Sequence, residues 1–365
     1  MQSRVVMLMD LDYFYAQCEE KRNPAIKDKP VVVCMFSGRS EDSGAVATAN
    51  YVARKYGVKS GIPIFMAKKK LEGVDSVFLP ADFTLYEQVS DNVMSILKEY
   101  ADSFEQVGID EAFLDVSQRV DGDFESAREL ASKIKSDLKT REGLSGSIGV
   151  GPNKLVAKIA SDVQKPDGLT VVKPGEVEGF LDPLPVDRLI GVGRKTVERM
   201  QALDVKTVGD LRGFDVQRLV EVFGRSLGVY FHNAAAGIDD SPVEQRGEAE
   251  SFSRIATLKE DTRDLNMILE KTNALCEDVH ATLTMHGYSY RTAGIYVVLT
   301  NMTAHSRSKT FEAPTDDLAT FKETVKELFD KLLTETEFKV RRVGVKAAGL
   351  VRAEKGQKAL TDFIE

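Results

Sequence analysis

Two pairs of acidic residues in this sequence are spaced so that they could act together. Asp10 and Asp12 follow the apolar run 5–9, and Asp110 and Glu111 stand at a tight turn in the stretch GIDEAFLDV. Strand residues that are two apart share one face of a sheet. If the strand that ends at the first pair lies beside the hairpin that carries the second, the carboxylates of Asp10, Asp110 and Glu111 converge.

Three carboxylates in one place need a cation to neutralise their charge. Neighbouring carboxylates repel one another and raise each other's pKa. A hard divalent cation such as Mg²⁺ removes that conflict and keeps positions open for water and substrate phosphates. Two such ions about 3.5–4 Å apart can activate a hydroxyl group and stabilise a leaving pyrophosphate. Any one of these acids could be an ordinary exposed acid at a strand end, but the two motifs together favour phosphoryl chemistry.

Groups that could hold a polyphosphate lie elsewhere in the chain. A hydroxyl, a phenol and a guanidinium follow one another at i, i+3 and i+6 in ATANYVARKYG, which predicts one face of a helix; they are Thr48, Tyr51 and Arg54. The guanidinium would add charge-assisted hydrogen bonds. Lys165 in QKPDG follows a predicted helix and precedes a turn, a suitable place for a cation that reaches phosphates. Lys154 and Lys158 are weaker candidates, because helices often expose lysines, and an amphipathic surface helix is the alternative for the first three.

The stretch IGVGRKT, residues 190–196, has the pattern of a helix-hairpin-helix turn. Gly191 and Gly193 would let the backbone approach a nucleic-acid phosphate so that its N–H groups donate directly, with Lys195 beside them. The motif is short, and an ordinary glycine turn between two helices competes with this interpretation.

These groups require a scaffold of mixed strands and helices. In the first half we expect a βαββαβ-like order, with strands at 4–9 and 31–35, a helix at 86–103, two strands around a turn at 104–117, a helix at 124–139, a strand in SGSIGVG and a further helix in NKLVAKIASDV. This order predicts an α+β core with a split sheet. The polar stretch 237–251 lacks periodicity and predicts an interdomain linker. A second α+β region follows, with helices at 264–286 and 318–334 and strands at 293–300 and 339–351.

Composition limits the class of protein. A chain of 365 residues can bury a large core and form two or more domains. No apolar run approaches the roughly 20 residues of a membrane span. Cys18, Cys34 and Cys276 lie far apart without CxxC spacing, which argues against a zinc site or disulfide framework and fits a reducing cytoplasm. The net charge of -8 means that a nucleic-acid-binding face would need its lysines and arginines segregated.

Taken together, the chain resembles the DinB, or pol IV, type of Y-family translesion DNA polymerase, and looks most like the archaeal members. The resemblance runs along nearly the whole chain and is carried by MDLDYFYAQCEE, SGAVATANYVARKYGVKSGIP, GIDEAFLDVS, GSIGVGPNKLVAKIASDVQKPDG and LIGVGRKTVERM. It implies a multidomain α+β right-hand fold. The implied parts are a palm at 1–13 and 81–172, fingers at 14–80, a thumb at 173–232, a linker at 233–248, a little finger at 249–352 and a tail at 353–365.

The resemblance also assigns residues. It implies catalytic metal ligands for two Mg²⁺ ions, with Mn²⁺ as a substitute: Asp10, Asp110, Glu111 and the backbone carbonyl of Leu11. Asp12 is the neighbouring acid that is not expected to bind metal. Tyr15 matches the aromatic steric gate, whose ring would clash with a ribose 2′-hydroxyl. The nucleotide-contacting positions are Tyr13, Phe14, Tyr15, Ala47, Thr48, Tyr51, Arg54 and Lys165. For Tyr13 to Tyr15, ordinary core packing is the alternative.

Further contacts are implied in the C-terminal half. For DNA we expect Gly191, Gly193 and Lys195 in the thumb, and Arg341 and Arg342 in the little finger, because strand alternation points at least one of the two toward DNA. The tail QKALTDFIE matches the sliding-clamp-binding pattern, with anchors Gln357, Leu360, Phe363 and Ile364. The family usually ends this motif on two aromatics; Ile364 replaces the second, which lowers the expected affinity for a PCNA-like clamp.

The implied function is template-directed DNA synthesis past damaged bases, with low fidelity and no proofreading exonuclease. Its partners would be primer–template DNA, a deoxynucleoside triphosphate and the clamp, bound by a cytoplasmic monomer without membrane contact. Three other classes compete. A nucleotidyl cyclase would share the acids but not the thumb turn, a metal-dependent nuclease would not need the gate, and a non-catalytic scaffold should have lost one of the acids.

Overall fold

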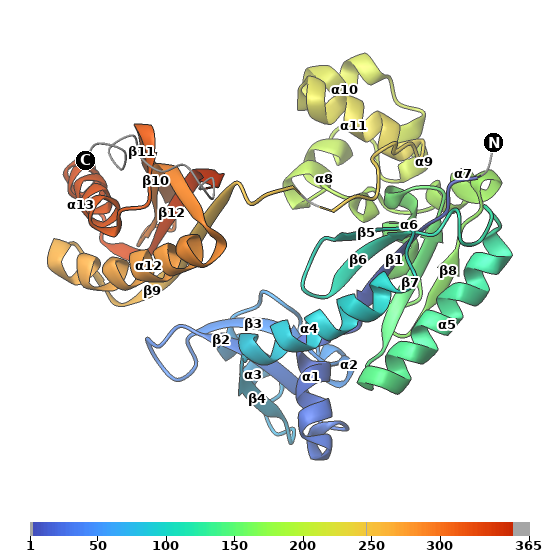
Figure 1. The fold of residues 1–365 in the computed structure, drawn as a ribbon, viewed down its shortest axis with the longest axis horizontal. Coiled ribbons are helices and arrows are strands. Elements are labelled where there is room, and N and C mark those ends of the chain that lie inside the picture. The colour runs from blue at the N-terminus through green and yellow to red at the C-terminus, as the bar shows by residue number, and fades with distance from the viewer. Residues whose placement is uncertain (1–2, 246, 353–365) are drawn as a thin grey trace, which may run out of the picture. The chain divides into compact units, whose positions relative to one another are not determined.

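The structure, a computed structural model, describes residues 3–245 and 247–352 (Figure 1). The described chain forms two compact units, one built from most of residues 3–245 and the other mainly from residues 247–352. Both combine helices with β-sheets, which confirms the α+β prediction. None of the helices in the described ranges combines the length and the apolar character that a membrane crossing requires.

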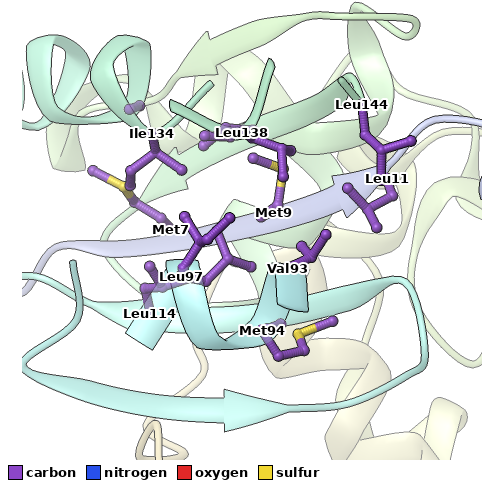
Figure 2. Close-up of a cluster of buried hydrophobic side chains, with 14 of the residues drawn as sticks. Met7, Met9, Leu11, Val93, Met94, Leu97, Leu114, Ile134, Leu138 and Leu144 are labelled. Atoms are coloured by element: carbon purple, nitrogen blue, oxygen red, sulfur yellow. The ribbon is translucent and has the colours of Figure 1, made fainter. Parts of the chain in front are cut away.

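A five-stranded sheet forms the centre of the first unit. Its order is β5-β6-β1-β7-β8, with bounds Ser103–Gln106, Glu111–Asp115, Val6–Leu11, Gly146–Gly151 and Leu169–Val171. Helices α4 (Phe83–Lys98) and α5 (Phe124–Glu142) cover one face. Figure 2 shows side chains of that core, including Met7, Met9 and Leu11 from β1. Because side chains alternate along a strand, Val6, Leu8 and Asp10 belong to the opposite face.

Helix α6 (Lys154–Val163) lies against that opposite face, at very close range to β7. A Cβ on Gly149 would lie 2.0 Å from the Ala157 carbonyl oxygen and 2.3 Å from the Ser161 nitrogen. The approach therefore depends on glycine, and it brings the side chains of α6 to the edge of the sheet where β1 ends.

Residues 237–243, here called the strap, return to the same face. The Asn153 side chain donates to the Gly237 carbonyl at 2.7 Å, and the Arg4 guanidinium donates to the Ser241 carbonyl at 2.7 Å. Val243 is 5% exposed and packs in a small cluster with Val6, Leu8, Phe113 and Ala157. The first part of the predicted linker is thus packed on the sheet, and residues 233–235 belong to helix α11 (Arg225–Ala235), which corrects the boundary at 233.

The rest of the first unit flanks this sheet. N-terminal elements are α1 (Phe14–Arg22), η1 (Pro24–Ile26), β2 (Val31–Phe36), β3 (Gly44–Ala49), α2 (Tyr51–Arg54), α3 (Ile64–Lys70) and β4 (Val77–Pro80), with sheet order β3-β2-β4. After β8 come η2 (Pro174–Glu176), α7 (Val177–Leu181), η3 (Val186–Arg188), α8 (Arg194–Gln201), α9 (Val208–Arg212), α10 (Val216–Phe223) and α11, which share a core of their own.

Two local predictions were wrong. Thr48 lies in strand β3 and not in one helix with Tyr51 and Arg54, because the buried Asn50 accepts from the Ala53 N–H and so starts the helix after the strand. The helix predicted at 86–103 spans Phe83–Lys98 instead, since Asp82 caps its start, and the strand β5 already begins at Ser103.

The second unit is a four-stranded antiparallel sheet backed by two helices. Its order is β11-β10-β12-β9, with bounds Ala304–Thr315, Tyr288–Leu299, Val340–Arg352 and Ser251–Thr262. Helices α12 (Leu265–His286) and α13 (Leu318–Glu335) match the predicted helices and pack on one face. β9 and β11 were not predicted.

We expect Gly149→Ala to destabilise the first unit by about 3 kcal/mol or more, because the added methyl group forces α6 away from β7. Gly175→Ala is the control, since a Cβ there would meet no atom within 4 Å. The chain has no tryptophan, so chemical unfolding is followed by circular dichroism. Equal stability of the two variants would contradict the close packing of α6.

Candidate active site

One cavity of about 390 Å³ opens where β1 runs into α1. Its lining includes all eight residues predicted to contact a nucleotide, two of the predicted metal-binding acids, and three further positions: Tyr13, Phe14, Tyr15, Ala47, Thr48, Tyr51, Arg54, Lys165, Asp10, Asp110, Leu11, Asp12 and Ser60. The structure thus brings together groups that come from four separate stretches of the sequence. Glu111 is not among the lining residues.

Strand pairing places the acids next to one another. In the antiparallel register of β1 and β6, Asp10 lies directly opposite Glu111. The Leu11 N–H donates to the Asp110 carbonyl at 2.9 Å, which ties the turn before β6 to the end of β1. Each strand is held by the buried apolar residues that precede or follow its acid, so the sheet core fixes the position of the carboxylates.

Two lysines lie among these carboxylates. The Lys158 ammonium is 3.0 Å from one oxygen of Asp10 and also contacts Glu111, and the Lys165 ammonium is 2.7 Å from the other oxygen of Asp10. Burial alone would lower the pKa of Lys158, but the charges of Asp10 and Glu111 outweigh burial and raise it. The pKa of Lys165 is likewise raised, because Asp10 and Asp162 outweigh burial. Both lysines are therefore held as cations.

The charged form of Asp110, unlike that of the two lysines, is disfavoured by its surroundings. Burial raises its pKa, and the charges of Asp10 and Glu111 raise it further, against a weaker opposing effect of Lys158. The ionised form of Asp110 is therefore disfavoured beside two neighbouring carboxylates. Among the described residues, however, no three acidic, histidine or cysteine side chains are assembled as a ready metal site. The assignment of metal ligands stays a prediction.

Stacked aromatic rings form one wall of the cavity. The ring of Tyr15 stacks on that of Tyr86 with centroids 4.4 Å apart and an interplanar angle of 15°. The Tyr86 hydroxyl donates to Glu19 at 2.7 Å, and this buried carboxylate is 2.5 Å from the Arg22 guanidinium. Phe14 is 3% exposed, so the alternative of core packing applies to it. Tyr15 is only half-buried, and it lines the cavity while its ring is stacked on Tyr86.

The polar wall of the cavity is equally constrained. Tyr13 adopts φ 38° and ψ 43° immediately before α1, a left-handed conformation that is uncommon outside glycine. Its ring meets that of Tyr51 edge-on, with centroids 5.4 Å apart. The Arg54 guanidinium lies 4.6 Å from the centre of the Tyr51 ring, and its Nε donates to the Ala49 carbonyl at 2.9 Å. Within residues 3–245 and 247–352, no other hydrogen bond or ion pair engages the remaining guanidinium donors, which could therefore bind a ligand.

Two residues of this region, Ser60 and Tyr86, were not predicted from the sequence. Ser60 lines the cavity from the turn after α2, and serine in a turn carries no distinguishing signal. Tyr86 is one apolar position of an amphipathic helix, so its stacking on Tyr15 could not be read from the sequence. Lys158 was a weak candidate for phosphate binding and instead contacts the acids. Lys154 lies elsewhere, 2.7 Å from Glu105.

The predicted DNA contacts occupy two other regions. Gly191 has φ +81°, and it and Gly193 precede α8, where Lys195 is exposed. In the second unit, the Arg341 guanidinium is engaged by Asp261 at 3.0 Å, whereas Arg342 is exposed. Since Val343 and Val345 are buried against the helices, alternation places Arg342 and Lys346 on the face of the sheet that the helices leave open. The clamp-binding anchors lie outside the described residues.

Comparisons with known proteins agree along the whole chain. Residues 9–162 match the model of the impB/mucB/samB family, residues 249–360 match the C-terminal domain of that family, and residues 187–239 match a DNA polymerase-iota thumb domain. A DNA polymerase IV of Nitrosopumilus maritimus is 46% identical over 364 residues, covering 100% of both chains. One from Saccharolobus solfataricus is 37% identical and covers 96% of this chain and 97% of its own.

Solved structures show the same relationship. A Y-family DNA polymerase chimera of Dbh and Dpo4 superposes with a TM-score of 0.90 at 34% identity, covering 96% of this chain and 100% of its own. An insertion ternary complex of Dbh DNA polymerase gives a TM-score of 0.68 at 34% identity with the same coverage. The matches confirm the right-hand fold and the little-finger domain. The chain therefore belongs to the DinB type of the Y family and is a DNA-directed DNA polymerase.

Proposed function

We propose that this polymerase performs low-fidelity translesion synthesis, in which the primer 3′-hydroxyl attacks a deoxynucleoside triphosphate and pyrophosphate leaves. The observation that carries the proposal is the single cavity where carboxylates, phosphate-binding groups and a clamped aromatic ring meet. A cyclase would explain the acids alone and a nuclease would not need the ring. Full-length similarity to DNA polymerases favours the first function over both.

The donor set fits magnesium. Asp10, Asp110, Glu111 and the Leu11 carbonyl are all oxygen donors, which Mg²⁺ prefers and Mn²⁺ accepts. The lysine ammonium groups at Asp10 and Glu111 indicate that these carboxylates hold cationic charge at this place. Two bound ions would activate the primer hydroxyl and neutralise the leaving pyrophosphate. Catalysis then depends on positioning and on preorganised charge.

The remaining cavity residues would each contact a different part of the nucleotide. Arg54 and Lys165 would bind the triphosphate by charge, with hydroxyls from Thr48 and Tyr51. The first N–H groups of α1 have no partners within the helix and are available to the phosphates. Tyr15 would exclude a ribose 2′-hydroxyl by contact. The small side chain of Ala47 would leave space for the nascent base pair.

Primer–template DNA would lie on the thumb turn and on the open face of the second sheet. Gly191 and Gly193 would present backbone N–H groups to phosphates, beside Lys195. On the sheet, Arg342 and Lys346 lie on the face that the helices leave open, whereas Arg307 and Lys309 pair with Glu335 and Glu327 of α13. This segregation resolves the net negative charge, because binding depends on the local field.

One partner is proposed on sequence alone. The tail from Gln357 would hold a PCNA-like sliding clamp through Leu360, Phe363 and Ile364, in the manner of a short apolar motif that enters a groove. We further propose that the polymerase acts as a monomer and, since its substrate is DNA, in the cytoplasm of a cell without a nuclear compartment.

Primer extension with Mg²⁺ and single deoxynucleotides, on intact templates and on templates with an abasic site, tests the function. We expect extension on both with frequent misinsertion. Asp110→Ala combined with Glu111→Ala should abolish extension while DNA binding survives, because the carboxylates act on the reacting groups and not on the duplex. Glu129→Ala, an exposed acid on α5, is the control. Extension by the double variant would refute the assigned role of these acids.

Tyr15→Ala should lower the preference for deoxyribonucleotides over ribonucleotides by roughly tenfold or more, because removal of a ring leaves room for the 2′-hydroxyl. Tyr15→Phe keeps the ring and should keep the preference. The ratio of kcat/KM for a deoxynucleotide and its ribonucleotide counterpart measures the effect. An unchanged ratio in Tyr15→Ala would remove this residue from sugar selection.

Asp110→Asn should stabilise the metal-free protein at neutral pH. The raised pKa of Asp110 means that its ionised form is disfavoured in the folded state, so its destabilising effect is complete above the folded pKa. The effect disappears as pH falls below the pKa of the unfolded chain. In thermal unfolding, the variant should therefore melt higher than the parent at pH 7 and equally at pH 3. Added Mg²⁺ should raise the melting temperature of the parent more than that of the variant.

A further inference from the structure

The turn that carries Lys165 is fastened to the sheet at several points. It spans residues 165–168, between α6 and β8, and only Lys165 of the four lines the cavity. Asp167 has φ +56°, and a Cβ on Gly168 would lie 2.4 Å from the Gln164 carbonyl oxygen. The turn therefore has a demanding backbone geometry, and conformations of this kind persist when the surroundings hold them.

Asp12 holds the turn from one side. It is 1% exposed, and both of its carboxylate oxygens are already occupied. One oxygen accepts from the Ser147 hydroxyl at 2.9 Å, and the other accepts from the Asp167 N–H at 2.8 Å and the Ser145 hydroxyl at 3.2 Å. Ser147 in turn accepts from the Gly168 N–H at 3.1 Å. Asp12 thus uses its charge on the backbone of the turn.

Lys135 holds the same turn from the other side. Its ammonium donates to the carbonyl oxygens of Asp167 and Gly168, at 2.5 and 3.0 Å, and to that of Gly146 in β7 at 3.2 Å. It also pairs with the Asp167 carboxylate at 2.8 Å. Lys135 comes from α5 and does not line the cavity. One cation therefore joins the turn, the sheet and a helix.

We propose that Asp12 and Lys135 are positioning residues that fix the place of the Lys165 ammonium, and so set the affinity of the cavity for the polyphosphate of a nucleotide. The inference rests on the proposed function of Lys165. It explains why two acids stand two residues apart at the end of β1. Asp10 points its charge at the reaction, and Asp12 points its charge at the turn that carries a phosphate-binding cation.

The test compares nucleotide KM and kcat in single-nucleotide primer extension. Lys135→Met keeps the side-chain stem and should raise KM about tenfold, with kcat nearly unchanged, because a charge-assisted anchor of Lys165 is lost. In a Lys165→Met background, Lys135→Met should add no further increase, since its effect passes through Lys165. Lys133→Met is the control, because Lys133 lies on the same helix but faces the ring of Tyr100.

Ser147→Ala is the second variant, for the event that loss of Lys135 prevents folding. It removes the hydroxyl between Asp12 and Gly168 without touching the cavity, and it should also raise KM. Asp12→Asn should leave Mn²⁺ affinity unchanged in a spin-resonance titration without nucleotide, whereas Asp10→Asn should weaken it. That readout separates a residue that positions the turn from one that binds metal.

Three results would overturn the inference: an unchanged KM in both Lys135→Met and Ser147→Ala, an equal effect of Lys135→Met with and without Lys165, or loss of Mn²⁺ binding in Asp12→Asn. Calorimetric titration with magnesium tripolyphosphate separates this failure from that of the proposed function. If the parent does not extend primers but binds tripolyphosphate more tightly than Lys135→Met does, the positioning role stands. If the parent neither extends primers nor binds tripolyphosphate more tightly than Lys135→Met does, both proposals are wrong.

Discussion

Repulsion between carboxylates is the constraint on which the rest of this site depends. The register of β1 and β6 forces Asp10 and Glu111 face to face, with Asp110 at the adjoining turn. Charges at such short range are tolerable only if cations neutralise them or protons bind. Helix α6 supplies one cation, Lys158, because glycine lets it approach β7 closely, and the following turn supplies the second, Lys165. Close packing of α6 on the sheet, which glycine permits, and the position of the following turn together bring two lysines to the carboxylates. The lysines reduce the repulsion between these negative charges.

Pairing of opposite charges also determines which basic residues remain exposed in the second unit. Acidic residues of α13 pair with bases that point toward the helices, which leaves Arg342 and Lys346 on the open face of the sheet. A chain with net charge -8 can therefore offer a basic surface of limited extent. Binding of phosphates by such a surface would weaken as the salt concentration rises.

Motifs with unusual local composition could be interpreted from the sequence, and contacts set by tertiary packing could not. Asp10, Asp110 and Glu111 lie at the ends of strands that can be recognised from their apolar runs, so the sequence predicts that these acids converge. Thr48 was placed in a helix because a spacing of three suits both a helix face and a strand–turn–helix boundary. β9 and β11 escaped notice because their polar residues alternate weakly with apolar ones on an open sheet. The stacking of Tyr86 on Tyr15 joins residues 71 positions apart in the sequence, and no local pattern encodes it.

The strap has a practical consequence for anyone who exchanges domains between relatives of this protein. Family models end the thumb at residue 239 and begin the C-terminal domain at 249, so a junction at 240 looks natural. Val243, however, packs in a cluster with Val6 and Leu8, and a smaller or polar residue there would leave this cluster incompletely covered. A hybrid joined after Val243 would keep the core of the first unit intact, so any change in its properties would come from the exchanged C-terminal domain. A hybrid joined at 240 would also replace Val243, so an effect of the new domain could not be separated from a defect in the core of the first unit.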